Sequence, residues 1–291
     1  MLLTLLSCTS TPTSVHKREH AEWHAARLSE LRDEQGWLSL VGLDFLTPST
    51  YTVGSAPTAR LHDPGCSAPL IGTWVVEPDS DRFHAEPGVE IQIKNGAEAQ
   101  PLRTDVGNTP SVVRYGRTSS PWLRRNGQFA LRVRDPRSSS RTHFTPIAMC
   151  AYDELYRMET EVTPAAPGQH LPITNVTGYT EQEPFAGFLS LVLDDQVHRF
   201  VATAGKDGRL LLVFSGPTNG KHGYLGGRFL DIPAPHHTRT WIDFNRAINA
   251  LRSFTGFGSA PLPPPRIDGA SRFSLAKGDR PTPERVVRVR P

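Results

Sequence analysis

Long apolar runs are missing from this 291-residue sequence. No stretch approaches the roughly 18 consecutive apolar residues that a membrane-spanning helix needs, so we expect no such helix. An excess of one charge is missing too: 32 Lys and Arg stand against 29 Asp and Glu, which leaves a net charge of +3. So small an excess gives no electrostatic footprint for nucleic acid, and we expect no nucleic-acid partner.

Cysteine is scarce, with three residues in the chain. Cys66 and Cys150 could form one disulfide in an oxidising compartment, but the sequence does not show whether their Cα atoms lie within bridging distance. Neither belongs to a Cys-x-x-Cys pair, so we expect no structural zinc. Cys66 follows a Pro-Gly turn and is expected to be exposed, whereas Cys150 ends an apolar run and is expected to be buried.

Common catalytic and cofactor-binding motifs are absent as well. The sequence contains no nucleophile elbow, phosphate-binding loop, dinucleotide fingerprint or zinc-protease motif. His16, His20 and His24 have a spacing at which one helix face can hold a metal, but no third ligand from elsewhere accompanies them. We interpret them as a solvated helix face and expect neither a metal nor a cofactor.

The first residues contain a lipidation signal in truncated form. Leu5-Leu6-Ser7-Cys8 resembles the bacterial lipobox, in which a signal peptidase cuts before a Cys that carries lipid. We assign residues 1–14 to this signal and a flexible tether. The segment lacks a basic n-region and its apolar stretch is short, so two interpretations stay open. Either the protein is anchored to the cell envelope through lipid on Cys8 alone and its true start lies upstream, or this is a cytoplasmic N-terminus that matches by chance.

Proline and glycine are abundant, and with 26 Pro and 24 Gly long helices cannot dominate the chain. One helix is expected over 15–35, where Trp23, Leu28 and Leu31 recur near helical spacing before Gly36. The remaining chain alternates short strands with turns, and Asn95-Gly96 and Asp207-Gly208 are the expected hairpin turns. We predict a mainly β fold, with a β-sandwich over 36–136, a second β-sandwich or barrel-like domain over 140–278, and a tail over 279–291.

Candidate binding residues gather in the second half of the chain. Adjacent glycines let the backbone approach a partner closely, and the guanidinium beside them suits a carboxylate or a phosphate. The candidates are Tyr224, Gly226, Gly227, Arg228, Asp243 and Asn245. In a structural interpretation Arg228 and Asp243 are buried and satisfy each other; in a binding interpretation the cluster holds a small anionic or protein ligand.

We favour a non-catalytic lipoprotein of the cell envelope with a binding or structural role. The alternative is a hydrolase-like enzyme with a cleft around His222, Arg228 and Asp243, in which His222 or Asp243 acts as general base. A second polar cluster, containing Arg132, Arg134, Asp135 and Arg141, is interpreted as a solvated strand face.

Five motifs occur in order along the chain, and together they resemble the prokaryotic domain of unknown function 1684 family. They are Gly36–Leu38 with Gly42–Leu46, Arg132–Pro136 with Arg141 and Phe144, Gly226–Leu230, Asp243–Ala247 and Pro261–Pro265. The resemblance covers residues 20–278. It implies no established activity, but it implies that many relatives are exported or lipid-anchored.

The sequence departs from the family pattern at three places. Ala250–Arg252 stands where relatives have a Pro-Pro-Cys-like stretch, and Ala260 stands where they have a second cysteine. Gly216 or Pro217 occupies the place of an acidic residue before the Gly-Gly-Arg motif. Any disulfide, metal site or catalysis that relatives build on those residues is therefore not expected in this chain.

The first half, over 36–135, also has a rhythm of strands and turns similar to that of forkhead-associated sandwiches. Those phosphothreonine readers use an Arg after the first strand's Gly, whereas here Ser55 follows Gly54, and their Ser/His pair is not present. The resemblance therefore implies the fold, and phosphopeptide binding does not follow from it.

Overall fold

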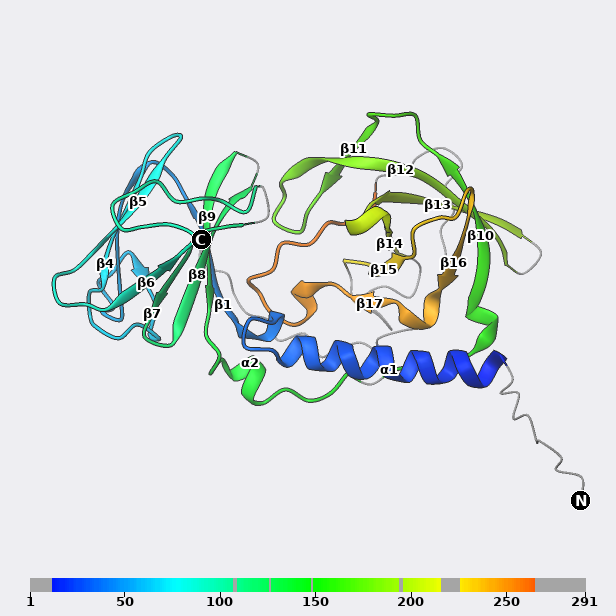
Figure 1. The fold of residues 1–291 in the computed structure, drawn as a ribbon, viewed down its shortest axis with the longest axis horizontal. Coiled ribbons are helices and arrows are strands. Elements are labelled where there is room, and N and C mark those ends of the chain that lie inside the picture. Colours follow the sequence, from blue (N-terminus) through cyan, green and yellow to red (C-terminus); the bar gives the residue numbers. More distant parts are fainter. Residues whose placement is uncertain are drawn as a thin grey trace, which may run out of the picture. The chain divides into compact units, whose positions relative to one another are not determined.

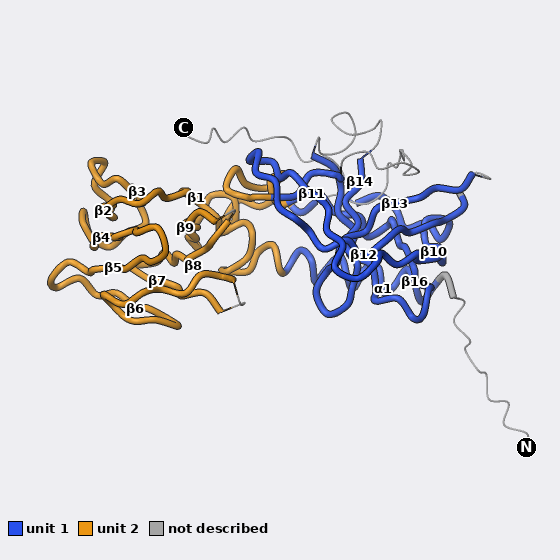
Figure 2. Tube along the Cα trace, turned by 90° about the horizontal axis from the view of Figure 1, so that it is seen from above, with its two compact units in different colours: residues 1–29, 146–250, 260–283 blue, residues 30–145, 251–259, 284–291 orange. Residues whose placement is uncertain are grey.

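The computed structural model describes residues 12–106, 109–125, 127–147, 149–193, 196–215 and 226–264. The chain divides into two units, which Figure 2 colours separately. Unit 1 is made of residues 1–29, 146–250 and 260–283, and unit 2 of residues 30–145, 251–259 and 284–291. The fold is mainly β with an N-terminal helix, as predicted. Among the described residues, no helix is both long and apolar enough to cross a membrane.

The predicted helix is confirmed as α1 (Pro12–Arg32). It ends before Gly36, where a Cβ atom would lie 2.3 Å from the Glu30 carbonyl oxygen, so only glycine fits this close approach. Two arginines donate hydrogen bonds to backbone carbonyl groups at and just after the C-terminal end of α1. Arg141 donates from Nε to the Arg32 carbonyl at 2.6 Å, and Arg134 donates from Nη1 to the Gly36 carbonyl at 3.1 Å.

These contacts correct the interpretation of the second polar cluster as a solvated strand face. Arg134 and Arg141 act as cations at the C-terminal end of a helix, where carbonyl groups lack intrahelical partners. Arg132 is half-buried, and burial lowers the pKa of its guanidinium to about 10. Asp135 is buried at 7% exposure and forms an ion pair.

Unit 2 contains two sheets (Figure 1). The five-stranded sheet has the order β1-β9-β8-β7-β6 and the four-stranded sheet the order β3-β2-β4-β5. The strands are β1 (Leu40–Leu46), β2 (Ser49–Gly54), β3 (Leu61–His62), β4 (Gly72–Val76), β5 (Asp81–Ala85), β6 (Ile91–Lys94), β7 (Val112–Tyr115), β8 (Thr118–Arg125) and β9 (Gln128–Arg134). Short helices at Trp37–Ser39 (η1), Ser139–Thr142 (α2) and Leu251–Ser253 (η5) complete it.

Side chains from both sheets share one core, which makes unit 2 a β-sandwich. Trp74 of the four-stranded sheet stacks on Trp122 of the five-stranded sheet, with 4.5 Å between ring centroids. Both rings are fully buried, and Phe83 and Phe129 pack beside them. Burial of such aromatic surface is the main stabilising contribution to a core of this kind.

The expected hairpin at Asn95-Gly96 is wrong. Asn95 does take the left-handed conformation, with φ of 59°, but β6 pairs with β7, which begins at Val112. The positive φ therefore opens a long connection instead of a two-residue turn. The Ser111 hydroxyl holds the two ends of this connection, because it donates to the Asn95 carbonyl at 2.8 Å.

Unit 1 contains an eight-stranded sheet with the order β16-β10-β12-β13-β14-β15-β17, and β11 pairs with β12 (Figure 1). The strands are β10 (Arg157–Pro164), β11 (His170–Thr174), β12 (Thr180–Leu193), β13 (Gln196–Ala204), β14 (Leu210–Phe214), β15 (Arg228–Ile232), β16 (Arg239–Asp243) and β17 (Ile248–Asn249). Short helices lie at Glu154–Tyr156 (η2), Lys206–Gly208 (η3) and Phe244–Arg246 (η4).

The sheet of unit 1 curls around a single core. β15 contacts β16 as well as β14, so the two ends of the strand path approach each other. Leu189, Leu212 and Ile242, from three different strands, are almost fully buried in this core. The Asp207-Gly208 turn between β13 and β14 is confirmed, with φ of 53° and 73° at the two residues.

In the described chain, Cys66 and Cys150 do not form a disulfide with each other. Cys66 is half-buried in unit 2, so the expected exposure of its turn is wrong. Cys150 is half-buried in unit 1 and less enclosed than its apolar run suggested. Cys8 lies outside the described residues.

Candidate functional site

The predicted glycine and arginine cluster lies at the start of β15. Gly227 has φ of +94°, and a Cβ atom there would meet the Pro263 side chain at 2.8 Å and the Phe214 carbonyl at 2.9 Å. This glycine is therefore required by the close approach of the chain's own backbone. Arg228 is buried at 3% exposure and pairs in register with Phe214 and Asn249. Gly226 is half-buried, while Tyr224 and His222 lie outside the described residues.

The structural interpretation expected Asp243 to pair with Arg228, and this expectation is wrong, because Asp243 pairs with Arg246. Its Oδ2 atom lies 3.4 Å from Nε of Arg246, and its Oδ1 atom accepts hydrogen bonds from the backbone N–H of Asn245 at 3.1 Å and from its side-chain amide at 2.8 Å. The carboxylate thus caps the short helix η4.

Asn245 connects three segments of unit 1. It is buried at 2% exposure, and its side chain forms two hydrogen bonds with the backbone of Asp153, one in each direction, at 3.1 and 2.9 Å. Its carbonyl lies 3.2 Å from Nε2 of His20 on α1. All polar atoms of the Asn245 side chain thus bind the chain itself, which gives this residue a structural role.

The histidine stripe on α1 is not a solvated face, and that interpretation is wrong. His20 is buried at 8% exposure, and Nδ1 of His16 lies 2.8 Å from Oε1 of Glu154. Desolvation lowers the pKa of His20 below its usual value, although the Asn245 carbonyl and Asp243 oppose this shift. The sequence did contain a signal for this packing, because His16, His20 and His24 are four residues apart and therefore share one helix face.

A cavity with a volume of about 590 Å³ lies instead in unit 2. The alternation of buried and exposed side chains along β7 explains why Arg114 lines this cavity. Val113 and Tyr115 point into the core, so Arg114 must point to the opposite face of the sheet. Arg114 pairs in register with Gln92 on β6 and with Ser119 on β8, and directly paired residues share one face. Gln92, Arg114 and Ser119 therefore form a polar row across three strands.

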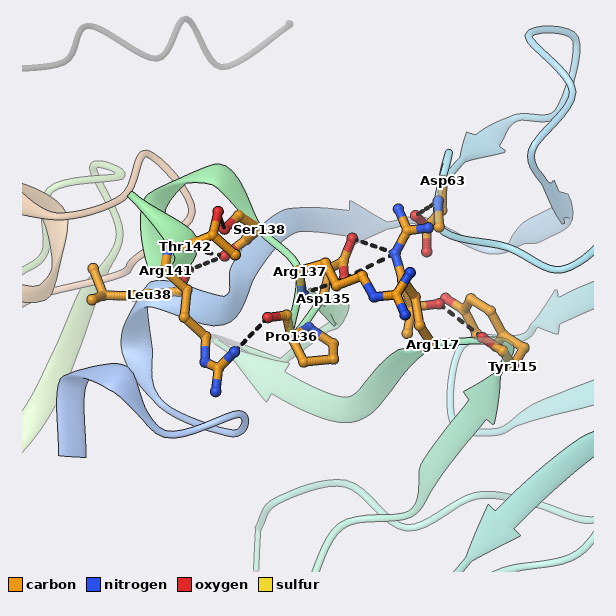
Figure 3. Close-up of polar contacts among 12 residues, drawn as sticks. Leu38, Asp63, Tyr115, Arg117, Asp135, Pro136, Arg137, Ser138, Arg141 and Thr142 are labelled. Atoms are coloured by element: carbon orange, nitrogen blue, oxygen red, sulfur yellow. Dashed lines mark hydrogen bonds and ion pairs between the residues drawn. The ribbon is translucent and has the colours of Figure 1, made fainter. Parts of the chain in front are cut away.

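Arg117 follows this row at the turn between β7 and β8 and also lines the cavity. Its Nε atom donates to both carboxylate oxygens of Asp135, at 3.0 and 2.9 Å, and Asp135 also accepts from the backbone N–H of Arg137 at 2.8 Å (Figure 3). Within the described chain, the two terminal nitrogens of Arg117 have no hydrogen-bond partner. The Arg117 side chain is 42% exposed, whereas that of Asp135 is 10% exposed. A buried carboxylate thus holds the base of an accessible guanidinium.

A tightly packed loop lies beside this ion pair. Asp63 accepts at Oδ1 from the backbone N–H of Gly65 at 2.8 Å (Figure 3). A Cβ atom on Gly65 would lie 2.3 Å from Cγ2 of Thr118, so this position accommodates only glycine. Gly116, with φ of +56°, brings its own backbone close to the same loop, where a Cβ atom would meet the Gly65 carbonyl oxygen at 3.2 Å. The wall of the cavity is thereby fixed by close backbone contact.

The pKa of Cys66 and the hydroxyl of Ser119 favour a binding site over a site with a reactive nucleophile. Burial, together with the nearby carboxylate of Asp63, raises the pKa of the Cys66 thiol to about 12. The thiol therefore stays protonated and unreactive at neutral pH. Ser119 is buried at 4% exposure, and its hydroxyl has no hydrogen-bond partner in the described chain. A hydroxyl without a partner at the edge of a cavity is a donor available to a bound anion.

Sequence reasoning missed Arg114 and Arg117, although it singled out Asp135. A signal existed for Arg114, because it alternates with the apolar residues of a short strand. Nothing in the sequence shows that Asp135, 18 positions along the chain, holds Arg117.

The comparison with protein families agrees with the resemblance. Residues 142–267 match the family model described as "Protein of unknown function (DUF1684)". No curated protein matches the chain. A solution NMR structure of an uncharacterized protein from Haloarcula marismortui is similar at 23% identity and a TM-score of 0.39, and the match covers 48% of this chain and 78% of that one. The resemblance to this family of unknown function is therefore confirmed over residues 142–267, which lie mostly in unit 1.

Proposed function

We propose that this protein is a non-catalytic binding protein and that the cavity of unit 2 takes a small ligand through an anionic group. The observation that carries this proposal is the pairing of Arg117 with buried Asp135 through Nε alone. This pairing orients the guanidinium and leaves its two terminal nitrogens available to a carboxylate or phosphate.

Two neighbouring groups support the same ligand chemistry. Arg114 lines the cavity and has no ion pair in the described chain, and the Ser119 hydroxyl has no partner there. A pre-oriented arginine loses less side-chain freedom on binding than a mobile one, so the ion pair with Asp135 increases affinity. The cavity volume falls within the range typical of small-molecule sites, about 300–1,000 Å³.

A binding role fits the side chains of this cavity better than catalysis. The thiol of Cys66 stays protonated, and the lining residues of the described cavity include no histidine. In unit 1, the carboxylate of Asp243 caps η4 and pairs with Arg246, so it is not placed as a general base.

Calorimetric titration tests the proposal with three probes: acetate, succinate and inorganic phosphate. We expect at least one to bind, and we expect Arg117→Gln to weaken that binding at least tenfold. Asp135→Asn should weaken it too, because it releases the base of Arg117. Arg137→Gln is the matched control, since this exposed arginine lies two residues from Asp135 and does not line the cavity. Equal losses in Arg117→Gln and Arg137→Gln, or no binding of any probe, would refute the proposal.

We also propose a cell-envelope location with lipid attached at Cys8. The lipobox-like run Leu5–Cys8 supports it, and the family resemblance implies exported relatives. Metabolic labelling with a palmitate analogue in a bacterial host should label the wild-type protein and not Cys8→Ser. Equal labelling of both, or of neither, would contradict the anchor.

A further inference from the structure

The cavity of unit 2 carries acidic side chains as well as basic ones. Arg114 and Arg117 contribute two positive charges to its lining, and Glu34 and Glu90 contribute two negative charges. The lining is therefore close to neutral in formal charge. A cavity built for a multiply charged anion would be expected to carry a positive excess, because each carboxylate repels such a ligand.

Glu90 lies on the same side of the sheet as the arginines. Ile91 pairs in register with Tyr115, and both side chains belong to the core side of the sheet. The residue before Ile91 therefore points to the opposite face, where Gln92 and Arg114 lie. Glu90 directly precedes Ile91, which pairs with Tyr115, and it lines the same cavity as Gly116 and Arg117.

The carboxylate of Glu90 is available to a ligand. Its residue is exposed, and within the described chain it forms neither an ion pair nor a side-chain hydrogen bond. Glu34, in contrast, lies 3.9 Å from Nη2 of Arg141, which partly neutralises it. Glu90 is thus the acidic group that a cationic part of a ligand would meet.

We infer that the ligand is a zwitterion of the amino acid or short peptide class, with its carboxylate on Arg117 and its ammonium group on Glu90. This inference rests on the proposed function, because it uses the same anion-binding arginine. The buried, unpartnered hydroxyl of Ser119 adds an independent donor on the carboxylate side. A phosphate dianion would gain from the two arginines but would be repelled by both glutamates, whereas a zwitterion gains from groups of each sign.

The test compares ligands that differ in one charge. The probes are the standard free L-amino acids and alanyl-alanine, together with the N-acetylated and the C-amidated form of each one that binds. We expect binding of at least one zwitterion, and we expect either modification to weaken it about tenfold, the effect of about 1.4 kcal/mol. In Glu90→Gln the N-acetylated form should bind as well as the parent, whereas the carboxylate should still be needed.

Glu86→Gln is the matched control, because Glu86 lies in the same loop and does not line the cavity. It should retain the wild-type preference for the free ammonium group. If the N-acetylated form binds the wild-type protein as tightly as the parent, and Arg117→Gln abolishes both, the zwitterion inference is wrong while the anion site stands. If no probe with a carboxylate binds the wild-type protein, the zwitterion inference is wrong, and the anion site stands only if inorganic phosphate binds and Arg117→Gln weakens that binding.

Discussion

Asp81 is predicted to make unit 2 less stable as the pH rises. Its side chain is 1% exposed at the start of β5, and its Oδ2 atom has no hydrogen-bond partner in the described chain. Burial raises the pKa of this carboxyl from 3.8 to about 7. Between these two values the unfolded chain is ionised while the folded chain keeps its proton, so unfolding releases a proton and the free energy of unfolding falls with rising pH.

The magnitude follows from the two pKa values. At 1.36 kcal/mol per pKa unit, a shift of this size destabilises the folded state by about 4 kcal/mol at pH 8. More than half of that loss accumulates between pH 5 and pH 8, and well above the folded pKa the loss is constant. Asp81→Asn removes the titration while keeping the shape of the side chain. The variant should therefore be more stable than the wild type at pH 8, and the difference should shrink toward pH 5.

Urea unfolding at several pH values measures this effect. The stacked Trp74 and Trp122 rings lie in the core of unit 2, so their exciton signal in circular dichroism reports on the folding of this unit. Asp79→Asn is the matched control, because the Asp79 side chain is 92% exposed and should not alter the pH dependence. If wild type and Asp81→Asn lose stability with the same slope between pH 5 and pH 8, the reasoning from burial is wrong.

Three further predictions concern unit 1. Arg228→Ala should destabilise unit 1 by about 2–4 kcal/mol, because Arg228 is 3% exposed. Arg209→Ala is the control: it removes a surface ion pair and should cost less than about 1 kcal/mol. Thermal unfolding of the two variants measures the difference. Asn245→Ala should cost about 2–3 kcal/mol and raise hydrogen exchange over η2, since it breaks the two bonds to Asp153. The lowered pKa of His20 means that the unfolded chain binds the proton first, so stability should fall as the pH drops below about 6.5. A wild-type acid slope unchanged in His20→Gln would contradict this assignment.

The strands that could be predicted are those whose own residues alternate or form a short apolar run. β9 alternates apolar and basic residues, and β14 is a continuous apolar run next to an Asp-Gly turn. β8 could not be predicted from its own residues, because it begins Thr-Ser-Ser-Pro, a run typical of loops, although Ser119 and Ser120 are buried in the structure. Pairing with β7 and β9 on its two sides overrides the local preference of this strand.

The cavity could not be predicted for a similar reason. Its lining includes residues of β7, β8, the turn between them, the loop after Gly88 and the segment after β9, and only the folded register brings them together. The glycine motif at 226–227 was conspicuous in the sequence, but its glycines allow the chain's own backbone to pack closely. A glycine pair beside an arginine thus predicts a close approach without showing whether the partner is a ligand or the protein itself.

The segment Arg134–Pro136 shows how one motif serves both the fold and the cavity. β9 ends at Arg134, whose guanidinium donates to the Gly36 carbonyl beyond the end of α1. The next residue, Asp135, holds Arg117, and Pro136 lines the cavity itself. Because these three neighbours are joined by the chain, a shift in the segment after α1 would change the position of the carboxylate that orients Arg117. The motif therefore links the packing around the end of α1 to the position of the Arg117 guanidinium in the cavity.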